Sequence, residues 1–298
     1  MSKRDRAKAQ KPYKVKWLYQ YFGISKQAYY KRIQADKAKE DRDQVVLNLV
    51  KKVRKVHRRS GGRKLHKYIR EGLKQNNIKM GRDALFDLLR SYGMLVKKTK
   101  RYHVTTDSNH GFYKSPNRIK DMEITHSEQV FVSDITYIKT DAGHAYLALV
   151  TDAYSKKLMG WALDDNMRAS LVVKALKMAT KRLEFHPKKI IHHSDRGIQY
   201  CCPEFTEYAT QHGYVLSTTQ QYDPYENAVA ERINATLKYE FGLKRRIKSV
   251  AIAQLMMREA AHIYNTQRLH WSLNLSTPEQ IHREYNSIKY KSYKREAA

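Results

Sequence analysis

The stretch Asp223-Pro-Tyr-Glu-Asn-Ala-Val-Ala-Glu-Arg-Ile-Asn-Ala-Thr-Leu-Lys-Tyr-Glu240 decides the fold that we predict for this 298-residue chain. The pair Asp223-Pro224 is a chain breaker, and apolar residues recur at helical spacing after it, which predicts a helix. Four positions form the apolar stripe of this helix: Ala230, Ile233, Leu237 and Phe241. One side of the helix is therefore expected to pack against a core.

A carboxylate lies beside this stripe. At 3.6 residues per turn, Glu231 shares a second face of the helix with Asn227, Asn234 and Lys238. The helix therefore presents one acidic group between two amides and an ammonium group, within a strongly basic protein. A chemical site has this arrangement, and so has a solvated helix face.

Two aspartates upstream stand at the ends of strand-like runs. Asp134 lies in Val130-Phe-Val-Ser-Asp-Ile-Thr-Tyr-Ile138, and Asp195 lies in Ile190-Ile-His-His-Ser-Asp-Arg-Gly197. There are 60 residues between the two aspartates and 35 between Asp195 and Glu231. The three acids thus form an ordered set with defined spacing.

This set resembles the Asp, Asp, Glu triad of the retroviral integrase superfamily. More narrowly, the chain resembles insertion-sequence transposases of the IS-three type, in particular the product of their second reading frame, OrfB. Four ordered motifs carry the resemblance over about half of the chain. They are Ser133-Asp-Ile-Thr-Tyr137, His193-Ser-Asp-Arg-Gly-Ile-Gln-Tyr200, Asn227-Ala-Val-Ala-Glu231 with Thr236-Leu-Lys238, and Tyr264-Asn-Thr-Gln-Arg-Leu-His270 with Thr277-Pro278.

The resemblance implies a polynucleotidyl transferase whose catalytic, metal-binding residues are Asp134, Asp195 and Glu231. Phosphodiester cleavage and strand transfer need negative charge neutralised at phosphorus and an oxygen nucleophile activated near neutral pH. Two Mg²⁺ ions about 3.5–4 Å apart do both, and such hard cations prefer carboxylate oxygen. We therefore expect two Mg²⁺ ions, with Mn²⁺ as a substitute, and we expect Gly197 to let the backbone turn sharply beside Asp195.

The helix of Glu231 resembles the retroviral integrases in a further respect. Its run Glu231-Arg-Ile-Asn-Ala-Thr-Leu-Lys238 is similar to their Glu-x-x-Asn-x-x-Leu-Lys element, in which the lysine touches the viral end beside the reactive phosphate. The resemblance implies that Asn234 and Lys238 contact DNA. A solvated surface lysine is the alternative for Lys238.

Other acidic residues compete for the metal positions. Asp152 is the rival metal ligand, and Asp223 and Glu226 are rivals for the third carboxylate. We expect these three to be structural or to act behind the ligands.

Adjacent His192 and His193 invite a zinc hypothesis. Neighbouring residues on a strand point to opposite faces, so the two rings cannot chelate one ion together. His193 can share a face with Asp195 and is expected, like Asn227, to support the ligands from behind, whereas His192 is expected to be packed or exposed. The adjacent Cys201 and Cys202 suit neither a disulfide nor a structural zinc site.

Charge is distributed unevenly along the chain. The formal net charge is +29, of which residues 1–120 carry +25 and the other 178 residues carry +4. A basic front joined to a near-neutral body indicates a polyanion-binding module, and the partner expected is double-stranded DNA. With no apolar run of membrane length and no secretory signal at the start, we expect no membrane partner and a cytoplasmic, nucleoid-associated bacterial protein.

The basic front shows helical patterns. Within residues 13–33, Gly23 breaks an apolar stripe and Ser25 can cap the next segment, which predicts a short helix-turn-helix. Four side chains of its second helix would face DNA: Lys26, Gln27, Lys31 and Arg32. A long amphipathic helix from Asp41 carries further basic residues on its exterior, among them Arg58 and Arg59, and ends at Ser60-Gly-Gly62. The element Gly61-Gly-Arg-Lys64 resembles one in the IS-three type transposases, which adds Arg63 and Lys64 to the expected DNA contacts.

The pattern changes to strands after residue 125. Strands at 130–139, 145–151 and 157–163 precede a helix at 169–183, a strand at 190–191, a helix at 205–212 and a strand at 214–217. This order predicts an α/β, ribonuclease H-like core, with three antiparallel strands followed by alternating helices and parallel strands. The predicted domains are a short helix-turn-helix (1–40), a helical DNA-binding bundle (41–96), a basic linker ordered only against DNA (97–125), the catalytic core (126–245) and a helical C-terminal extension with a basic tail (246–298).

These features predict a DNA transposase that binds the terminal inverted repeats of an insertion sequence and performs metal-dependent strand cleavage and strand transfer into target DNA. The resemblance implies a homo-oligomer on DNA and makes the first-reading-frame protein a candidate partner. Two alternatives stay open. One is a catalytically silent DNA-binding regulator derived from a transposase, and the other is a ribonuclease H-like nuclease.

Overall fold

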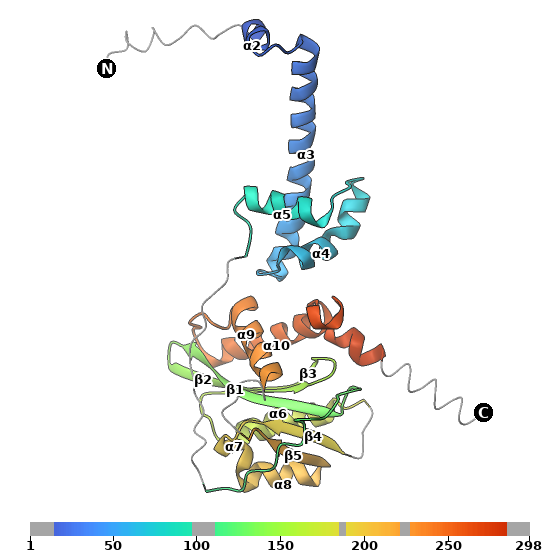
Figure 1. The fold of residues 1–298 in the computed structure, drawn as a ribbon. Coiled ribbons are helices and arrows are strands. Elements are labelled where there is room, and N and C mark those ends of the chain that lie inside the picture. The colour runs from blue at the N-terminus through green and yellow to red at the C-terminus, as the bar shows by residue number, and fades with distance from the viewer. Residues whose placement is uncertain (1–14, 97–110, 185–188, 221–226, 285–298) are drawn as a thin grey trace, which may run out of the picture. The chain divides into compact units, whose positions relative to one another are not determined.

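The computed structural model describes residues 15–96, 111–184, 189–220 and 227–284 (Figure 1). These residues form two compact units. One contains the residues up to Val56 and those from Gly61 to Val96, and the other contains His57–Ser60 and the residues from Lys97 onward.

The first unit is helical. Its elements are α2 (Val15–Tyr21), α3 (Lys26–Val56), α4 (Gly62–Gln75) and α5 (Arg82–Ser91). A turn with Gly23 at φ 64° separates α2 from α3. The prediction placed a domain boundary between residues 40 and 41, but α3 runs across this point without a break. Residues 33–44 contain neither Gly nor Pro, so nothing in the local sequence ends the helix.

The core of this unit forms between α3, α4 and α5. Its fully buried side chains are Val46, Leu47, Val50, Leu65, Ile69, Leu73, Leu85, Leu88 and Leu89. Gly62 is the first residue of α4, and a Cβ atom there would lie 2.7 Å from Cζ of Phe86 on α5. The Gly61-Gly62 pair therefore does more than separate α3 from α4, because the second glycine lets two helices approach closely.

The second unit is built on a five-stranded mixed sheet. Its strands are β1 (Val130–Thr140), β2 (Gly143–Asp152), β3 (Leu158–Asp164), β4 (Ile190–Ser194) and β5 (Tyr214–Thr218). The strand order is β3-β2-β1-β4-β5. Strands β1, β2 and β3 pair antiparallel, whereas β4 and β5 pair parallel. The predicted ribonuclease H-like order of three antiparallel strands followed by parallel ones is confirmed.

Helices cover both faces of this sheet (Figure 1). Ala148 and Val150 of β2 pack with α6 (Ala169–Lys181) and α8 (Pro203–Gln211) on one face. Their neighbours Leu147 and Leu149 face the other way and pack with α9 (Ala228–Glu240) and α10 (Val250–Thr266). Side chains alternate between the two faces of a strand, so a strand with apolar residues at successive positions, such as β2, is buried on both faces.

The C-terminal segment belongs to the same fold. Met257, Ala261 and Tyr264 of α10 are buried in the same apolar cluster as Leu147 and Leu149. The prediction treated residues 246–298 as an extension beyond the core, but α10 supplies one covering layer of the sheet. Beyond α10 lie a short 3₁₀ helix, η1 (Trp271–Leu273), and a helix that begins at Pro278.

The segment from Gly111 to Arg118 runs along β5, which is an edge strand. Thr218 Oγ1 donates to the carbonyl of Ser115 at 2.6 Å, and the backbone N–H of Arg118 donates to Ser217 Oγ at 2.9 Å. The prediction that residues 97–125 are a linker ordered against DNA stays a prediction. The described residues of this segment lie against the second unit and cover a sheet edge.

Gly160 on β3 sets how closely α6 approaches the sheet. A Cβ atom at this position would lie 2.1 Å from the carbonyl oxygen of Ala175 and 2.8 Å from the amide nitrogen of Ala179. We expect Gly160→Ala to lower the free energy of unfolding by about 1–3 kcal/mol, because α6 must shift or strain. Urea unfolding followed by circular dichroism measures this. Gly111→Ala is the control, since a Cβ at Gly111 meets no atom within 4 Å, and equal stability of the two variants would contradict the expectation.

Within the parts of the chain that the structure covers, every helix is too short or too polar to act as a membrane span.

Candidate active site

Asp134 lies near the middle of β1, which is flanked by β2 and β4. It pairs with Leu149 in the antiparallel register. Asp134 is half-buried, and Asn234 of α9 donates a hydrogen bond from Nδ2 to its Oδ2 at 2.6 Å. The carboxylate is therefore held in one orientation by a helix that lies 100 residues away in the sequence.

Asp195 directly follows the last residue of β4 and precedes the short helix α7 (Ile198–Cys201). The backbone N–H of Gly197 donates to its Oδ1 at 3.0 Å. The chain bends at Arg196, next to Asp195, but Gly197 has φ −60°, which any residue can adopt. A glycine fits here for another reason, because a Cβ would stand 3.0 Å from the same Oδ1.

Glu231 lies in the first turn of α9, and its side chain is exposed. The predicted stripe of this helix is buried through Ala230, Ile233 and Leu237. The face shared with Glu231 is not simply solvated, because Asn227 and Asn234 are also buried. Asn227 Nδ2 donates to the carbonyl of Ser133 at 3.1 Å. Two amides therefore fasten α9 to β1 on either side of the turn that carries Glu231.

Electrostatics link the three carboxylates. Burial raises the pKa of Asp134 to about 7, and the negative charges of Asp195 and Glu231 contribute to this rise, while the Asn234 hydrogen bond opposes it. The three carboxylates therefore repel one another when all are ionised, which destabilises the ionised form of Asp134. Carboxylate oxygens are the ligands that hard divalent cations prefer, and a cation would offset their repulsion, so the residues present fit such an ion.

The geometry does not show a closed metal site. Across residues 15–96, 111–184, 189–220 and 227–284, no three His, Cys, Asp or Glu side chains are grouped so that they could hold one ion together. Assignment of the three acids as ligands thus remains a proposal that rests on chemistry and charge.

Lys238 lies two turns along α9 from Glu231. Its Nζ is 4.3 Å from the centroid of the Tyr137 ring on β1, a cation–π contact. Burial lowers the pKa of Lys238, and the negative charge of Asp134 opposes this shift. Tyr137 was part of a motif quoted from the sequence, but the pattern assigned it no role, since its contact with Lys238 depends on the packing of α9 against β1.

We expect Lys238→Glu to lower the rate of 3′-end cleavage about 10²-fold, because it replaces a cation close to Asp134 by an anion at a position proposed to hold a DNA phosphate. Single-turnover cleavage of end-containing DNA measures this effect. Lys177→Glu is the matched control, because Lys177 also stands over a tyrosine ring, that of Tyr208, at 5.3 Å. Equal rates for the two variants would make Lys238 an ordinary surface residue.

The two adjacent histidines are both buried on β4. His192 packs against the rings of Tyr200, Phe205 and Tyr214, its Nε2 lies 2.7 Å from Ser133 Oγ, and burial lowers its pKa to about 3. His192 is therefore a packed residue, as expected. His193 pairs through Nδ1 with Ser217 Oγ at 2.9 Å. Its role behind the ligands stays a prediction.

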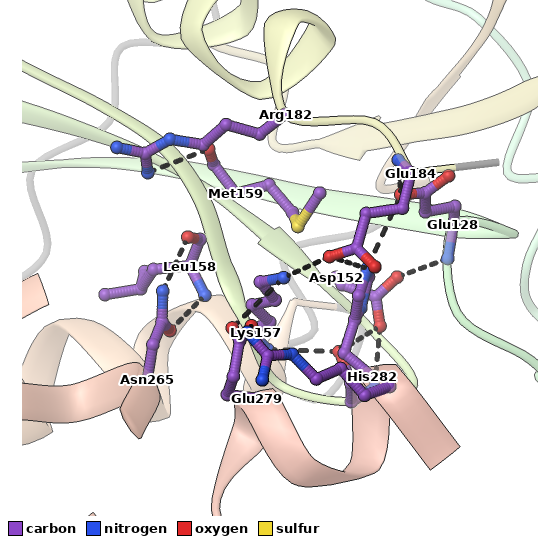
Figure 2. A network of polar contacts seen from close by, with 12 residues as sticks. Glu128, Asp152, Lys157, Leu158, Met159, Arg182, Glu184, Asn265, Glu279 and His282 are labelled. Carbon is purple, nitrogen blue, oxygen red and sulfur yellow. Dashed lines mark hydrogen bonds and ion pairs between the residues drawn. The ribbon is translucent and has the colours of Figure 1, made fainter. Parts of the chain in front are cut away.

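Asp152 belongs to a buried polar network (Figure 2). Its carboxylate accepts hydrogen bonds from the backbone N–H groups of Glu128 and Ser155, each at 2.6 Å, and from Ser155 Oγ at 2.7 Å. Ser155 Oγ also lies 3.0 Å from Nδ1 of His282, in the helix that begins at Pro278. Asp152 thus ties the C-terminal helix to the sheet, in agreement with a structural role. The rivals Asp223 and Glu226 lie outside the described residues.

The predicted DNA contacts in the basic front fall on two segments. Lys26, Gln27, Lys31 and Arg32 are exposed in the first turns of α3. Arg58 and Arg59 were expected on the exterior of a helix, but α3 ends at Val56 and they lie in the turn that follows. Arg63 and Lys64 lie in the first turn of α4. Contact of any of these residues with DNA stays a prediction.

Known proteins share this core. Residues 124–224 and residues 212–278 each match an integrase core domain family. A protein described as the uncharacterized 31 kDa protein of insertion element IS600, from Shigella sonnei, is 33% identical over 275 residues, which cover 91% of this chain and 99% of that protein. The transposase InsF for insertion sequence IS3A, from Escherichia coli K12, is 33% identical over 153 residues, 51% of this chain and 53% of that protein.

Among solved structures, the HTLV-2 integrase catalytic core domain in complex with magnesium is 17% identical, with a TM-score of 0.42, and the match covers 53% of this chain and 97% of that one. The sheet order, the aspartates on β1 and after β4, and the domain matches define a protein with an integrase core. The chain belongs to the insertion-sequence transposases of the IS3 type, within the retroviral integrase superfamily.

Proposed function

We propose that this protein is a DNA transposase, which binds the terminal inverted repeats of its own insertion sequence, cleaves there and joins the freed 3′ ends to target DNA. One observation carries the proposal. The fold brings the three acids of the predicted triad to one region, because Asp134 lies on a central strand, Asp195 follows the neighbouring strand β4, and Asn227 and Asn234 bind the helix of Glu231 to β1. Family membership supports the same activity.

We propose Asp134, Asp195 and Glu231 as the residues that hold two Mg²⁺ ions, with Mn²⁺ as a substitute. Bound ions of this kind neutralise charge at phosphorus and activate an oxygen nucleophile. The chain itself supplies orientation. Asn234 fixes the carboxylate of Asp134, the Gly197 N–H fixes that of Asp195, and Asn227 anchors the first turn of α9, from which Glu231 extends.

DNA is the proposed partner of both units. The basic helical unit is proposed to hold the terminal repeats, with Lys26, Gln27, Lys31, Arg32, Arg58, Arg59, Arg63 and Lys64 as contacts. Asn234 and Lys238 are proposed to meet the end near the reacting phosphate. Strand transfer requires two ends and a target, so a homo-oligomer on DNA is proposed, with the first-reading-frame protein as a further candidate partner.

The deciding experiment incubates the full chain with duplexes that end in the terminal repeat of its element, with Mg²⁺ and a target plasmid. Nicking at the repeat end followed by joining to the plasmid is expected. Repeat binding without nicking would favour a silent regulator. Cleavage of RNA–DNA hybrids without repeat binding would favour a ribonuclease H-like nuclease.

A further inference from the structure

A cavity of about 240 Å³ lies at the carboxyl ends of β4 and β5. Its wall includes Ser194 from β4, Thr218 from β5, Tyr200 from α7, Thr206 from α8, and Tyr113 and Ser115 from the segment along the sheet edge. The carboxyl ends of parallel strands are where open α/β sheets place their ligands. The edge segment therefore completes a cavity as well as covering β5.

The cavity lies within electrostatic reach of Asp195, one of the proposed catalytic carboxylates, because the charge of Asp195 acts on two wall residues, Tyr200 and Cys201. Tyr200 is only 4% exposed, and its buried hydroxyl has no hydrogen-bond partner within the described part of the chain. Burial together with the charges of Asp195 and Asp134 raises the pKa of this phenol, so its hydroxyl stays neutral and lies within electrostatic reach of both acids. A buried hydroxyl without a partner is costly unless a ligand supplies one.

The cavity wall is uncharged and has both apolar and polar parts. The described residues that line it include no Lys, Arg, Asp or Glu, and its polar groups are mainly hydroxyls. Positive charge lies near the wall. Burial raises the pKa of Cys201, a wall residue, and the charges of Lys114 and Arg196 oppose this rise, so both cations are close to the cavity. Arg196 is held in place by hydrogen bonds to the carbonyls of Thr219 and Gln220. The arrangement suits a neutral group inside and phosphates outside.

We propose that this cavity receives one nucleobase, unstacked from the DNA end next to the phosphodiester that is cleaved. The inference rests on the proposed transposase function. A nucleobase is neutral and planar, and its edge groups can pair with the hydroxyl of Tyr200, which lacks a partner within the described residues. Tyr113 is 80% exposed where the edge segment meets the cavity, so its ring is available for stacking with a base. Lys114 and Arg196 supply the positive charge near the wall, and we place the flanking phosphates on their side of the cavity.

The test uses the full chain and repeat-end duplexes that carry 2-aminopurine at one position at a time around the cleavage site. Because 2-aminopurine brightens when it unstacks, binding in Ca²⁺ is expected to raise fluorescence at one position only. Thr206→Phe, which fills the cavity from α8, is expected to abolish this rise and to slow cleavage in Mg²⁺ about 10-fold or more. Thr210→Phe is the matched control on the exposed side of the same helix and should behave as the wild type.

A second pair of variants tests the stacking contact without filling the cavity. Tyr113→Ala is expected to slow cleavage in Mg²⁺, and Tyr113→Phe, which keeps the ring, is expected to restore the wild-type rate. An abasic nucleotide at the responding position should make wild type and Thr206→Phe cleave at equal rates.

Wild-type protein that binds and cleaves the ends without a fluorescence rise at any position would overturn the inference and leave the transposase function standing. Identical behaviour of Thr206→Phe and Thr210→Phe, both folded by circular dichroism, would do the same. Failure of the wild type to bind repeat ends would overturn the proposed function, and this inference with it.

Discussion

Asp134→Asn, Asp195→Asn and Glu231→Gln are each expected to lower the rate of strand cleavage at least about 10³-fold, equivalent to about 4 kcal/mol of lost transition-state stabilisation. Each change keeps size and polarity but removes a negative charge that a divalent cation needs. Cleavage of labelled repeat-end DNA under single-turnover conditions measures the rate. Binding of the same DNA is expected to change little, because the repeat contacts are proposed to lie in the helical unit.

Thermal melting supplies a second measurement that does not depend on catalysis. Mg²⁺ or Mn²⁺ should raise the melting temperature of the wild type, because the cation relieves repulsion among the acids, and should raise that of the three variants less. Asp165→Asn is the control, since Asp165 is an exposed carboxylate in the turn after β3. Near wild-type cleavage by any one of the three variants would remove that residue from the site.

Removal of residues 1–110 is expected to weaken DNA binding about 10³-fold or more near physiological salt, because most of the excess positive charge lies in that part of the chain. The fragment begins at Gly111 so that it retains the segment bound along β5. Each lost phosphate contact should also reduce the slope of log affinity against log salt by about 0.9. Fluorescence anisotropy across a salt series measures both quantities.

Two full-length variants separate the contributions within the helical unit. Lys31→Glu with Arg32→Glu alters the start of α3, and Arg63→Glu with Lys64→Glu alters the start of α4. Retention of the native circular dichroism spectrum by the fragment is required for the comparison. A folded fragment that binds as tightly as the full chain would place the DNA-binding surface in the catalytic unit instead.

The sequence was sufficient for the order and type of most elements. Alternation along β2 places Leu147 and Leu149 on one face and Ala148 and Val150 on the other, and the stripe of α9 is buried as its spacing predicts. These patterns are local, since burial of one face imposes a period of 2 on a strand and of 3.6 on a helix. The ordered acids, with their flanking motifs, likewise indicated the family before any fold was known.

Contacts between distant segments were decided only by tertiary structure. The helical spacing predicted that Asn227 and Asn234 share a face with Glu231. It did not predict that the two amides bind β1 while the acid stays exposed. The placement of Tyr200 within electrostatic reach of Asp195 and Asp134 was equally hidden, because Asp134 lies on a distant strand. The period of a helix or strand indicates which face is buried, but it does not indicate which element covers that face. The hydrogen bond between Asn234 and Asp134, which are 100 residues apart, therefore forms only when the helix packs on the sheet.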